Sequence, residues 1–184
     1  VMVRSMNDGS NSRSAGLHLL LTVWGVGSVL AILIHAVCDL TPIAIEALDG
    51  IELNWWQWMI TGAWVVLMAY SEGYQGFHLS FSPRVVARAF HLAEEPRLHR
   101  VLLAPAYCMG LFHARRRTLI VAWIVTLGVV VLVLIVREIP QPWRGLIDLG
   151  VVIGLALGTL SIVMWFVRGL SRPEGRLRDA ALPD

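Results

Sequence analysis

Histidines are the first side chains in this sequence that could hold a cofactor, because the chain has six of them and only two cysteines. A b-type haem needs two histidines at similar depth on facing helices. His18, His78 and His113 each lie near one end of a different apolar stretch, so they are the expected ligands for one haem or for a chlorophyll-type magnesium. The opposite ends offer only His35. A second haem for transmembrane electron transfer therefore lacks a histidine pair, and haem is disfavoured.

A second group with chemical potential is the H-x-x-C-D pattern formed by His35, Cys38 and Asp39. On a helix, spacings of three and four place all three side chains on one face. Imidazole and thiolate suit zinc or copper, and a nearby carboxylate could complete the ligand set. No second ligand pair follows, although protein zinc sites usually have one. The simpler expectation is a pair between His35 and Asp39, with a metal site as the alternative.

Two acidic residues, Glu72 and Asp148, lie inside apolar stretches. Ionisable residues within a membrane are functional candidates by default, so a proton-coupled transporter is one hypothesis. We expect Glu72 to lie within reach of His18 or of the arginines at 115–117. We expect Asp148 to lie about one turn from the other end of its stretch, near Arg137. Because both positions are close to an interface, a structural ion pair is favoured over proton transfer.

Glycine recurs at every fourth position in Gly150, Gly154 and Gly158. This spacing lines one face of a helix with small residues, and such a face allows a second helix backbone to approach closely in lipid. The pattern does not identify the partner, which could be the first apolar stretch, the third, or another chain. Packing within the same bundle is the favoured interpretation.

The elements that must position these residues are long apolar helices. Residues 118–136 (TLIVAWIVTLGVVVLVLIV) carry no charge and would span roughly 28 Å as a helix, close to the ~30 Å hydrocarbon core of a bilayer. Arg115, Arg116 and Arg117 precede this stretch. A lone strand could not satisfy its backbone hydrogen bonds in lipid, whereas a helix satisfies them internally. Residues 118–136 are therefore predicted to form a transmembrane helix.

Three further apolar stretches, at 17–37, 55–77 and 145–167, predict a total of four transmembrane helices in a single membrane domain covering residues 1–184. The content of 57% hydrophobic and 15% charged residues agrees, since soluble domains carry about 25% charged residues. Thr41-Pro42 is expected to end the first helix, and the loop after it to hold a short amphipathic helix broken at Gly50. The fold class is an all-α polytopic membrane protein.

Arginine positions predict how this protein lies in the membrane. Thirteen of the fifteen basic residues lie before the first apolar stretch, between the second and third, or after the fourth; only Arg137 and Arg144 lie on the other side. The positive-inside rule then places both termini in the cytoplasm, with polar tails at 1–16 and 168–184. The predicted location is the bacterial inner membrane, with lipid as one partner. The net charge of +2 does not suggest nucleic-acid binding.

The segment 82–117 is predicted to be a cytoplasmic or interfacial helical segment between the second and third spans. Ser82 suits an N-cap and Pro83 the first helical position, and the helix should end at Glu95-Pro96 with Arg84 and Arg88 on its polar face. Residues 101–113 (VLLAPAYCMGLFH) are apolar but too few to span. They could re-enter the membrane, lie in the interface or dock on another protein; packing against their own bundle is favoured.

These features support three functional hypotheses. The favoured one is a small non-catalytic accessory subunit or assembly factor, which would pack against other membrane-protein subunits through the glycine-rich fourth helix and the 101–113 segment. The alternatives are a cofactor-binding redox protein using the histidines above, and a small proton-coupled transporter using Glu72 and Asp148. The sequence has no HExxH motif, nucleophile elbow or phosphate-binding loop, and we do not expect an enzyme.

Overall fold

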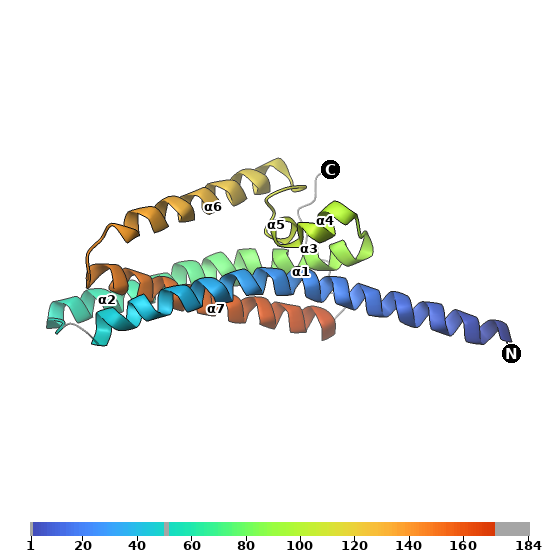
Figure 1. Cartoon of the computed structure of the whole chain (residues 1–184), viewed down its shortest axis with the longest axis horizontal. Helices are drawn as coiled ribbons and strands as arrows, with labels where there is room; N and C mark the ends of the chain where they lie inside the picture. The colour runs from blue at the N-terminus through green and yellow to red at the C-terminus, as the bar shows by residue number, and fades with distance from the viewer. Residues whose placement is uncertain (1, 50–51, 172–184) are drawn as a thin grey trace.

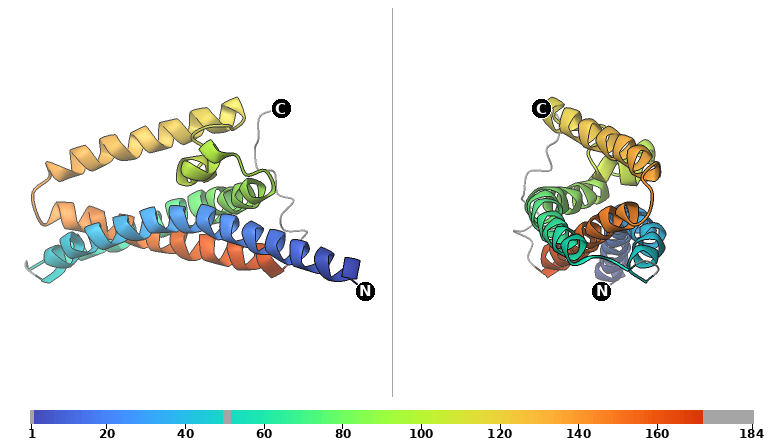
Figure 2. Two further views of the ribbon diagram at one scale, coloured as in Figure 1. Left: turned by 45° about the vertical axis from the view of Figure 1, so that its right-hand side comes forward. Right: turned by 90° about the vertical axis from the view of Figure 1, so that its left-hand side faces the viewer.

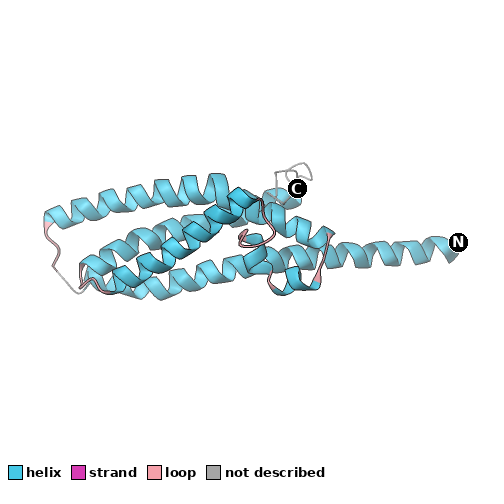
Figure 3. Cartoon of the chain, turned by 90° about the horizontal axis from the view of Figure 1, so that it is seen from above, coloured by secondary structure: helices cyan, strands magenta, loops and turns pink. Residues whose placement is uncertain are grey.

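The computed structural model describes residues 2–49 and 52–171, with side chains from residue 15 onward, and 88% of these residues are helical. Figure 3 shows the described chain as helices joined by short loops. The elements in order are α1 (Met2–Asp49), α2 (Trp55–Met68), the π-helix η1 (Ala69–Phe81), α3 (Ser82–Glu94), α4 (Leu98–Leu102), α5 (Ala104–Cys108), α6 (Arg116–Arg137) and α7 (Trp143–Ser171). The all-helical fold expected from the sequence is confirmed for the described residues.

Helix α1 is longer at both ends than the predicted 17–37 span. Residues 2–16, expected as a polar tail, form its first turns, and the helix continues through Pro42 to Asp49. The prediction that Thr41-Pro42 ends the helix is therefore wrong. A proline inside a helix removes one backbone hydrogen bond, but it breaks the helix only where packing does not hold both sides. Here Ala44 and Ala47, both beyond Pro42, are buried. Gly50 and the tail after Ser171 lie outside the described residues.

Helices α2, η1 and α3 join end to end into one rod over residues 55–94, which is visible in Figure 1 as the cyan-to-green stretch. Helix α3 begins at Ser82 with Pro83 in its first turn, as predicted, but Ser82 does not act as an N-cap, because Phe81 before it already has helical backbone angles and no side-chain cap is made there. The predicted helix end is confirmed, since Glu94 is the last helical residue and Glu95 leaves the helical conformation.

Helix α7 lies between α1 and the rod formed by α2, η1 and α3. Gly145 at its start lies against Ala47 near the end of α1, so α1 and α7 are antiparallel. Trp64 of α2 donates to the carbonyl of Ile147 at 3.1 Å, and Phe90 of α3 lies against Gly169. Residue numbers increase together in these last two contacts. The rod and α7 are therefore parallel neighbours (Figures 1 and 2).

Three helices are long and apolar enough to cross a membrane: Ala15–Asp49, Arg116–Arg137 and Trp143–Ser171. Their exposed side chains include many large aliphatic residues, such as Leu20, Ile34, Ile124 and Leu160. Such a surface suits lipid and not water. The fold therefore supports a multi-pass membrane protein.

The tightly packed core lies at one end of the bundle, where α3 and α5 meet α1 and α7. Val26 and Val29 of α1, Leu92 of α3, Tyr107 of α5 and Ile162 of α7 are each at most 1% exposed. This core covers the face of α3 that was predicted to lie along the membrane surface. Helix α3 is consequently packed inside the bundle and does not lie alone on a surface.

Helix α6 is packed far less than the other long helices. Among its 22 residues only Val136, at its end, is buried. Figure 2 shows α6 (yellow to orange) standing apart from α1, α7 and the rod when the bundle is viewed along its length. Its first half is tied to the bundle through a hydrogen bond from Trp123 Nε1 to the Leu111 carbonyl, at 3.1 Å.

Candidate functional site

The apolar segment 101–113 is fastened to its own chain by side chains from three helices. Trp24 of α1 donates to the Val101 carbonyl at 3.0 Å, and Trp123 of α6 donates to that of Leu111. Arg88 of α3 donates to the carbonyls of Tyr107, Phe112 and His113, at 2.6, 3.0 and 2.9 Å respectively. Irregular backbone near a membrane needs such partners for its carbonyls. The favoured prediction, packing against the chain's own bundle, is confirmed.

Arg88 is therefore a buried structural residue, although the sequence placed it on a solvent-facing helix surface. It is 1% exposed, and its guanidinium lies 4.3 Å from the centre of the Tyr107 ring. Burial lowers the pKa of Arg88, while the Tyr107 and Cys108 side chains act in the opposite direction. Burial also raises the pKa of the Cys108 thiol to about 12, so this cysteine is an inert part of the core.

The glycine face of α7 is covered by the rod. A Cβ on Gly158 would lie 2.5 Å from Phe77 of η1, one on Gly154 would lie 3.3 Å from the Glu72 carboxylate, and one on Gly150 would overlap the Trp64 indole. The expected close helix approach is confirmed. The partner is the second apolar stretch, which was not among the three partners considered, and the glycine face is not available to another chain.

The π-helix η1 accounts for the different numbers of residues that the rod and α7 use between their shared contacts. Moving from Trp64 to Phe90 takes 26 residues, whereas the matching step on α7, from Ile147 to Gly169, takes 22. A π-helix bonds residue i to i+5, so each of its turns uses more residues than the 3.6 of an α-helix. Long π-helical stretches are rare and often mark functional sites. Nothing in the sequence pattern signalled it.

Side chains of η1 form an aromatic ladder that ends at α7. Tyr70 stacks on Tyr74 and Tyr74 on His78, with ring centres 6.1 and 5.7 Å apart. His78 Nδ1 is 2.9 Å from the hydroxyl of Ser161, and Trp165 Nε1 donates to the His78 carbonyl at 3.1 Å. The ladder therefore holds one imidazole ring in a fixed place between η1 and α7.

A groove of about 400 Å³ runs beside this ladder, between η1 and α7. Most of its lining is apolar, and the residues that form it are Ala69, Gly73, Tyr74, His78, Leu157, Leu160, Ser161 and Met164. The lining has the usual character of a small-molecule site, a largely apolar wall with a few fixed polar groups. Ser161, which is 4% exposed, and His78 supply those polar groups. We take this groove, the η1–α7 groove, as the candidate functional site.

Glu72 occupies a different position from the one expected. Glu72 lies against Gly154, four residues before Gly158, which is the centre of the uncharged run 149–167 of α7. At about 1.5 Å per residue this is only ~6 Å from the middle of the run, so the prediction that Glu72 lies near the arginines at 115–117 is wrong. The structure brings no hydrogen-bonding or charged partner to Glu72 within the described residues. Glu72 therefore remains a candidate functional residue within a membrane-crossing segment.

Asp148 fits the simpler interpretation. It is 5% exposed, and Arg144 on the preceding turn lies 3.9 Å away as its ion-pair partner. The ion pair that the sequence favoured is therefore present, and its partner is an arginine of the same helix. A carboxylate paired in this way, at the end of a helix, has a structural role.

The predicted cofactor histidines do not converge. His18 and His113 are exposed, and His113 lies beside His99, with ring centres 6.4 Å apart. Of the three, His78 lines the η1–α7 groove. No ring contact joins two of the three among these residues, and the geometry gives no support to a bis-histidine haem.

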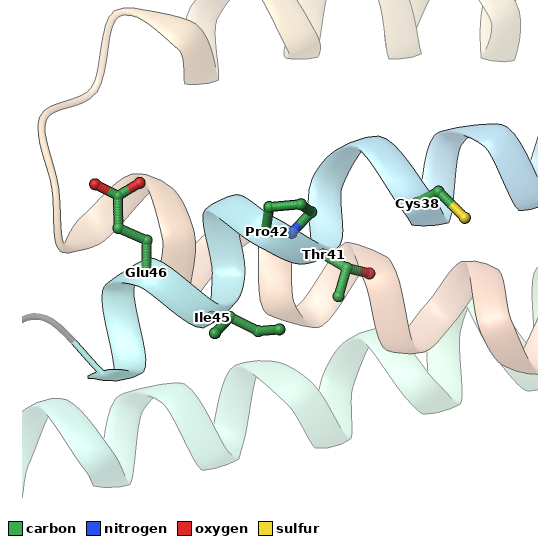
Figure 4. Close-up of a pocket in the computed structure, with 5 residues that line it drawn as sticks. All are labelled: Cys38, Thr41, Pro42, Ile45 and Glu46. Atoms are coloured by element: carbon green, nitrogen blue, oxygen red, sulfur yellow. The ribbon is translucent and has the colours of Figure 1, made fainter.

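The H-x-x-C-D residues do not form a three-ligand cluster. His35 and Asp39 form an exposed pair at 3.4 Å, as the simpler expectation had it. Cys38 instead borders a shallow surface depression with Thr41, Pro42, Ile45 and Glu46, all on α1, and Figure 4 shows Glu46 and Ile45 pointing in different directions. Within the described part of the chain, no group of three His, Cys, Asp or Glu side chains is placed to hold a metal ion.

Comparisons with protein-family models, with curated proteins and with solved structures give no match for this chain. The class of protein is therefore defined by the fold alone: an all-helical bundle with three helices able to cross a membrane.

Proposed function

We propose that the chain is a small, non-catalytic, four-span subunit of the bacterial inner membrane that associates with other membrane-protein chains through α6. The fourth span is the part of the rod formed by α2 and η1. It runs beside α7 over the same length, as the contacts of Trp64, Gly73 and His78 with α7 indicate. A rod in continuous contact with a membrane-crossing helix crosses the same layer.

The orientation rests on the two ends of the bundle. At one end, Trp56 and Trp143 lie with ring centres 5.6 Å apart, an arrangement typical of the membrane–water interface. Most of the described arginines lie toward the other end, among them Arg97 and Arg100 at α4, Arg115 at the start of α6 and Arg168 near the end of α7. The positive-inside rule places this second end, and both chain termini with it, in the cytoplasm.

Cysteine accessibility tests this orientation. In a Cys38→Ser background, Cys108 should not react with the label, because it is buried and the pKa of its thiol is raised to about 12. We expect Glu52→Cys to react with a membrane-impermeant maleimide in intact cells. We expect Arg97→Cys to react only after the membrane is permeabilised. Equal labelling of the two positions in intact cells would contradict the four-span arrangement.

The observation that supports association is the exposure of α6. Membrane helices associate by close side-chain packing, and a helix with little packing inside its own chain has its faces free for lipid or for another helix. Exposed apolar side chains occur all round α6, and Ile124, Leu127 and Val131, which are 64, 56 and 54% exposed, share one of its faces. Of the two surfaces first expected to dock, the glycine face is covered within the chain, and the 101–113 segment is partly covered, with Leu102 and Leu103 still 69 and 55% exposed. We propose α6 as the docking surface because its exposed apolar stretch is much longer.

Photo-crosslinking along α6 tests the association. A photoreactive amino acid is placed in turn at each position from 124 to 131, in the native membrane. We expect adducts to a second polypeptide at 124, 127 and 131 and weak ones between them, because a helix partner contacts one face. Ile34, a 50% exposed residue of α1, is the matched control and should give no such adduct.

Two outcomes would count against the proposal. Uniform lipid adducts along α6, with no protein adduct, would mean that α6 faces only lipid. A monodisperse monomer after extraction in mild detergent would mean the same. Adducts to a second copy of the chain would show that the partner is the same protein and that the chain forms a homo-oligomer.

A further inference from the structure

The η1–α7 groove has a polar end whose hydrogen bonding can be worked out from its neighbours. Hydroxyls on membrane helices commonly donate to the carbonyl four residues earlier. Ser71, Thr159 and Ser171 do so here. Ser161 does not; its hydroxyl is 2.9 Å from His78 Nδ1 instead. Within the described residues, this nitrogen is the one acceptor that the Ser161 proton reaches.

This arrangement selects the tautomer of His78. If Nδ1 carried the proton, the Ser161 hydroxyl would accept the bond and its own proton would lack an acceptor in a 96% buried setting, which is costly in lipid. If Ser161 donates to Nδ1, both groups are satisfied. The neutral ring then carries its proton on Nε2. His78 therefore offers a hydrogen-bond donor beside the groove, where no described residue accepts it.

The depth of the groove restricts the ligand. Ser161 lies three residues beyond Gly158, the centre of the uncharged run of α7, which places the donor about 5 Å from the middle of that run. The ester carbonyls and phosphates of phospholipids lie at the edges of a ~30 Å hydrocarbon core and do not reach this depth. No cationic residue lines the groove to hold a phosphate. The ligand must therefore be lipid-soluble and carry its acceptor inside the hydrocarbon.

We propose that the η1–α7 groove binds the head of a lipid-soluble quinone, with the Nε2–H of His78 donating a hydrogen bond to one ring carbonyl. The aromatic ladder offers flat faces for the ring, and the groove volume of about 400 Å³ lies within the range of small-molecule sites. The apolar tail of such a molecule stays in lipid. Metal ligation by Nε2 of His78 would require the other tautomer, with the proton on Nδ1 and the Ser161 hydroxyl without an acceptor. The inference rests on the four-span arrangement but not on association through α6.

Binding is tested with the full chain in lipid nanodiscs and 2-decyl-1,4-benzoquinone as the probe. We expect saturable binding to the wild-type protein above the level of empty nanodiscs. The infrared stretching band of the bound carbonyl should shift to lower frequency, because a hydrogen bond weakens the C=O bond. Decylbenzene, which has the same tail but no carbonyl, should show no saturable binding.

Three variants separate this site from an unspecific apolar surface. His78→Phe keeps an aromatic ring but removes the donor, and should weaken quinone binding about tenfold and abolish the infrared shift. Ser161→Ala removes the hydroxyl that holds the His78 proton on Nε2, and should weaken quinone binding roughly threefold. Ser71→Ala is the matched control, since its hydroxyl bonds to Leu67 of its own helix, and should bind like the wild type.

Any of three results would overturn the proposal. The first is saturable binding of decylbenzene equal to that of the quinone, and the second is unchanged quinone binding and an unchanged infrared shift in His78→Phe. The third is a haem or chlorin absorption spectrum of the purified wild-type protein that His78→Phe abolishes. Variants that fold are recognised by an unchanged elution profile. If His78→Phe does not fold, Ser161→Ala with the infrared band decides. Labelling of Glu52→Cys and Arg97→Cys reports separately on the four-span arrangement.

Discussion

Replacing Arg88 by alanine should destabilise the protein more than any other single arginine substitution described here. The guanidinium donates to three backbone carbonyls and lies over the Tyr107 ring. A buried carbonyl left without its donor costs about 1–3 kcal/mol, so the loss of three donors should cost several kcal/mol. The alanine variant would leave three buried carbonyls without donors and a cavity under Tyr107.

Thermal unfolding in detergent measures this loss, and trypsin locates it. When segment 101–113 is released, cleavage at the flanking arginines, Arg100 and Arg115, should become fast. Arg88→Lys should recover little, because one ammonium group cannot serve three carbonyls in the geometry of a planar guanidinium. Arg84 is the matched control on the same helix, since it bonds only to the Ser80 carbonyl one turn away. If Arg84→Ala and Arg88→Ala unfold at the same temperature, the proposed role of Arg88 is wrong.

The different fates of Arg84 and Arg88 show what sequence periodicity could predict. Helical spacing correctly placed both on one face of a helix ending at Glu94. Periodicity states that a face is polar, however, and not what covers it. The cover is residues 101–113, folded back over Arg88 by long-range contacts that no local pattern records. Burial of a charge became favourable only because this segment brings carbonyls to it.

Length and apolar content predicted the membrane-crossing helices well, and their boundaries less well. The run 118–136 lies within α6, and Gly145 to Val167 lies within α7. Helix α1 passes through Pro42 because tertiary packing beyond the proline outweighs the loss of one hydrogen bond. The π-helix was out of reach for a related reason: it is set by the register between two helices, and the sequence of either helix alone does not contain that register.

The candidate site was predictable only in part. Glu72 and His78 stood out as polar residues in or near an apolar stretch, but Ser161, the partner of His78, is one ordinary hydroxyl among several. It was distinguished only when η1 brought His78 next to it. Glycine spacing did predict that a helix would approach α7 closely at this level. The residues facing each glycine had to come from the structure, and they determine how severe a substitution will be.

Substituting Gly158 by alanine should separate α7 from the rod at the level of Phe77. The added methyl carbon would lie 2.5, 2.6 and 2.7 Å from three ring atoms of Phe77, well inside van der Waals contact. Phe77 itself packs edge-on against Phe81, so its ring cannot turn aside without disturbing a second aromatic contact. Overpacking of this kind costs about 1–3 kcal/mol, and valine at this position should cost more than alanine.

The same substitution at other glycines should give a graded series in thermal unfolding. At Gly154 the nearest atom is the end of the flexible Glu72 side chain, 3.3 Å away, so Gly154→Ala should lower the unfolding temperature only slightly. Gly128 on α6 has nothing within 4 Å of an added Cβ, and alanine there should be neutral or mildly stabilising, since alanine favours a helix by about 0.5–1 kcal/mol over glycine. Equal unfolding temperatures for Gly158→Ala and Gly128→Ala would show that α7 and η1 do not pack at Phe77. Because Gly158 and Ser161 lie on the same stretch of α7, a separation of the two helices there should also weaken the bond between Ser161 and His78.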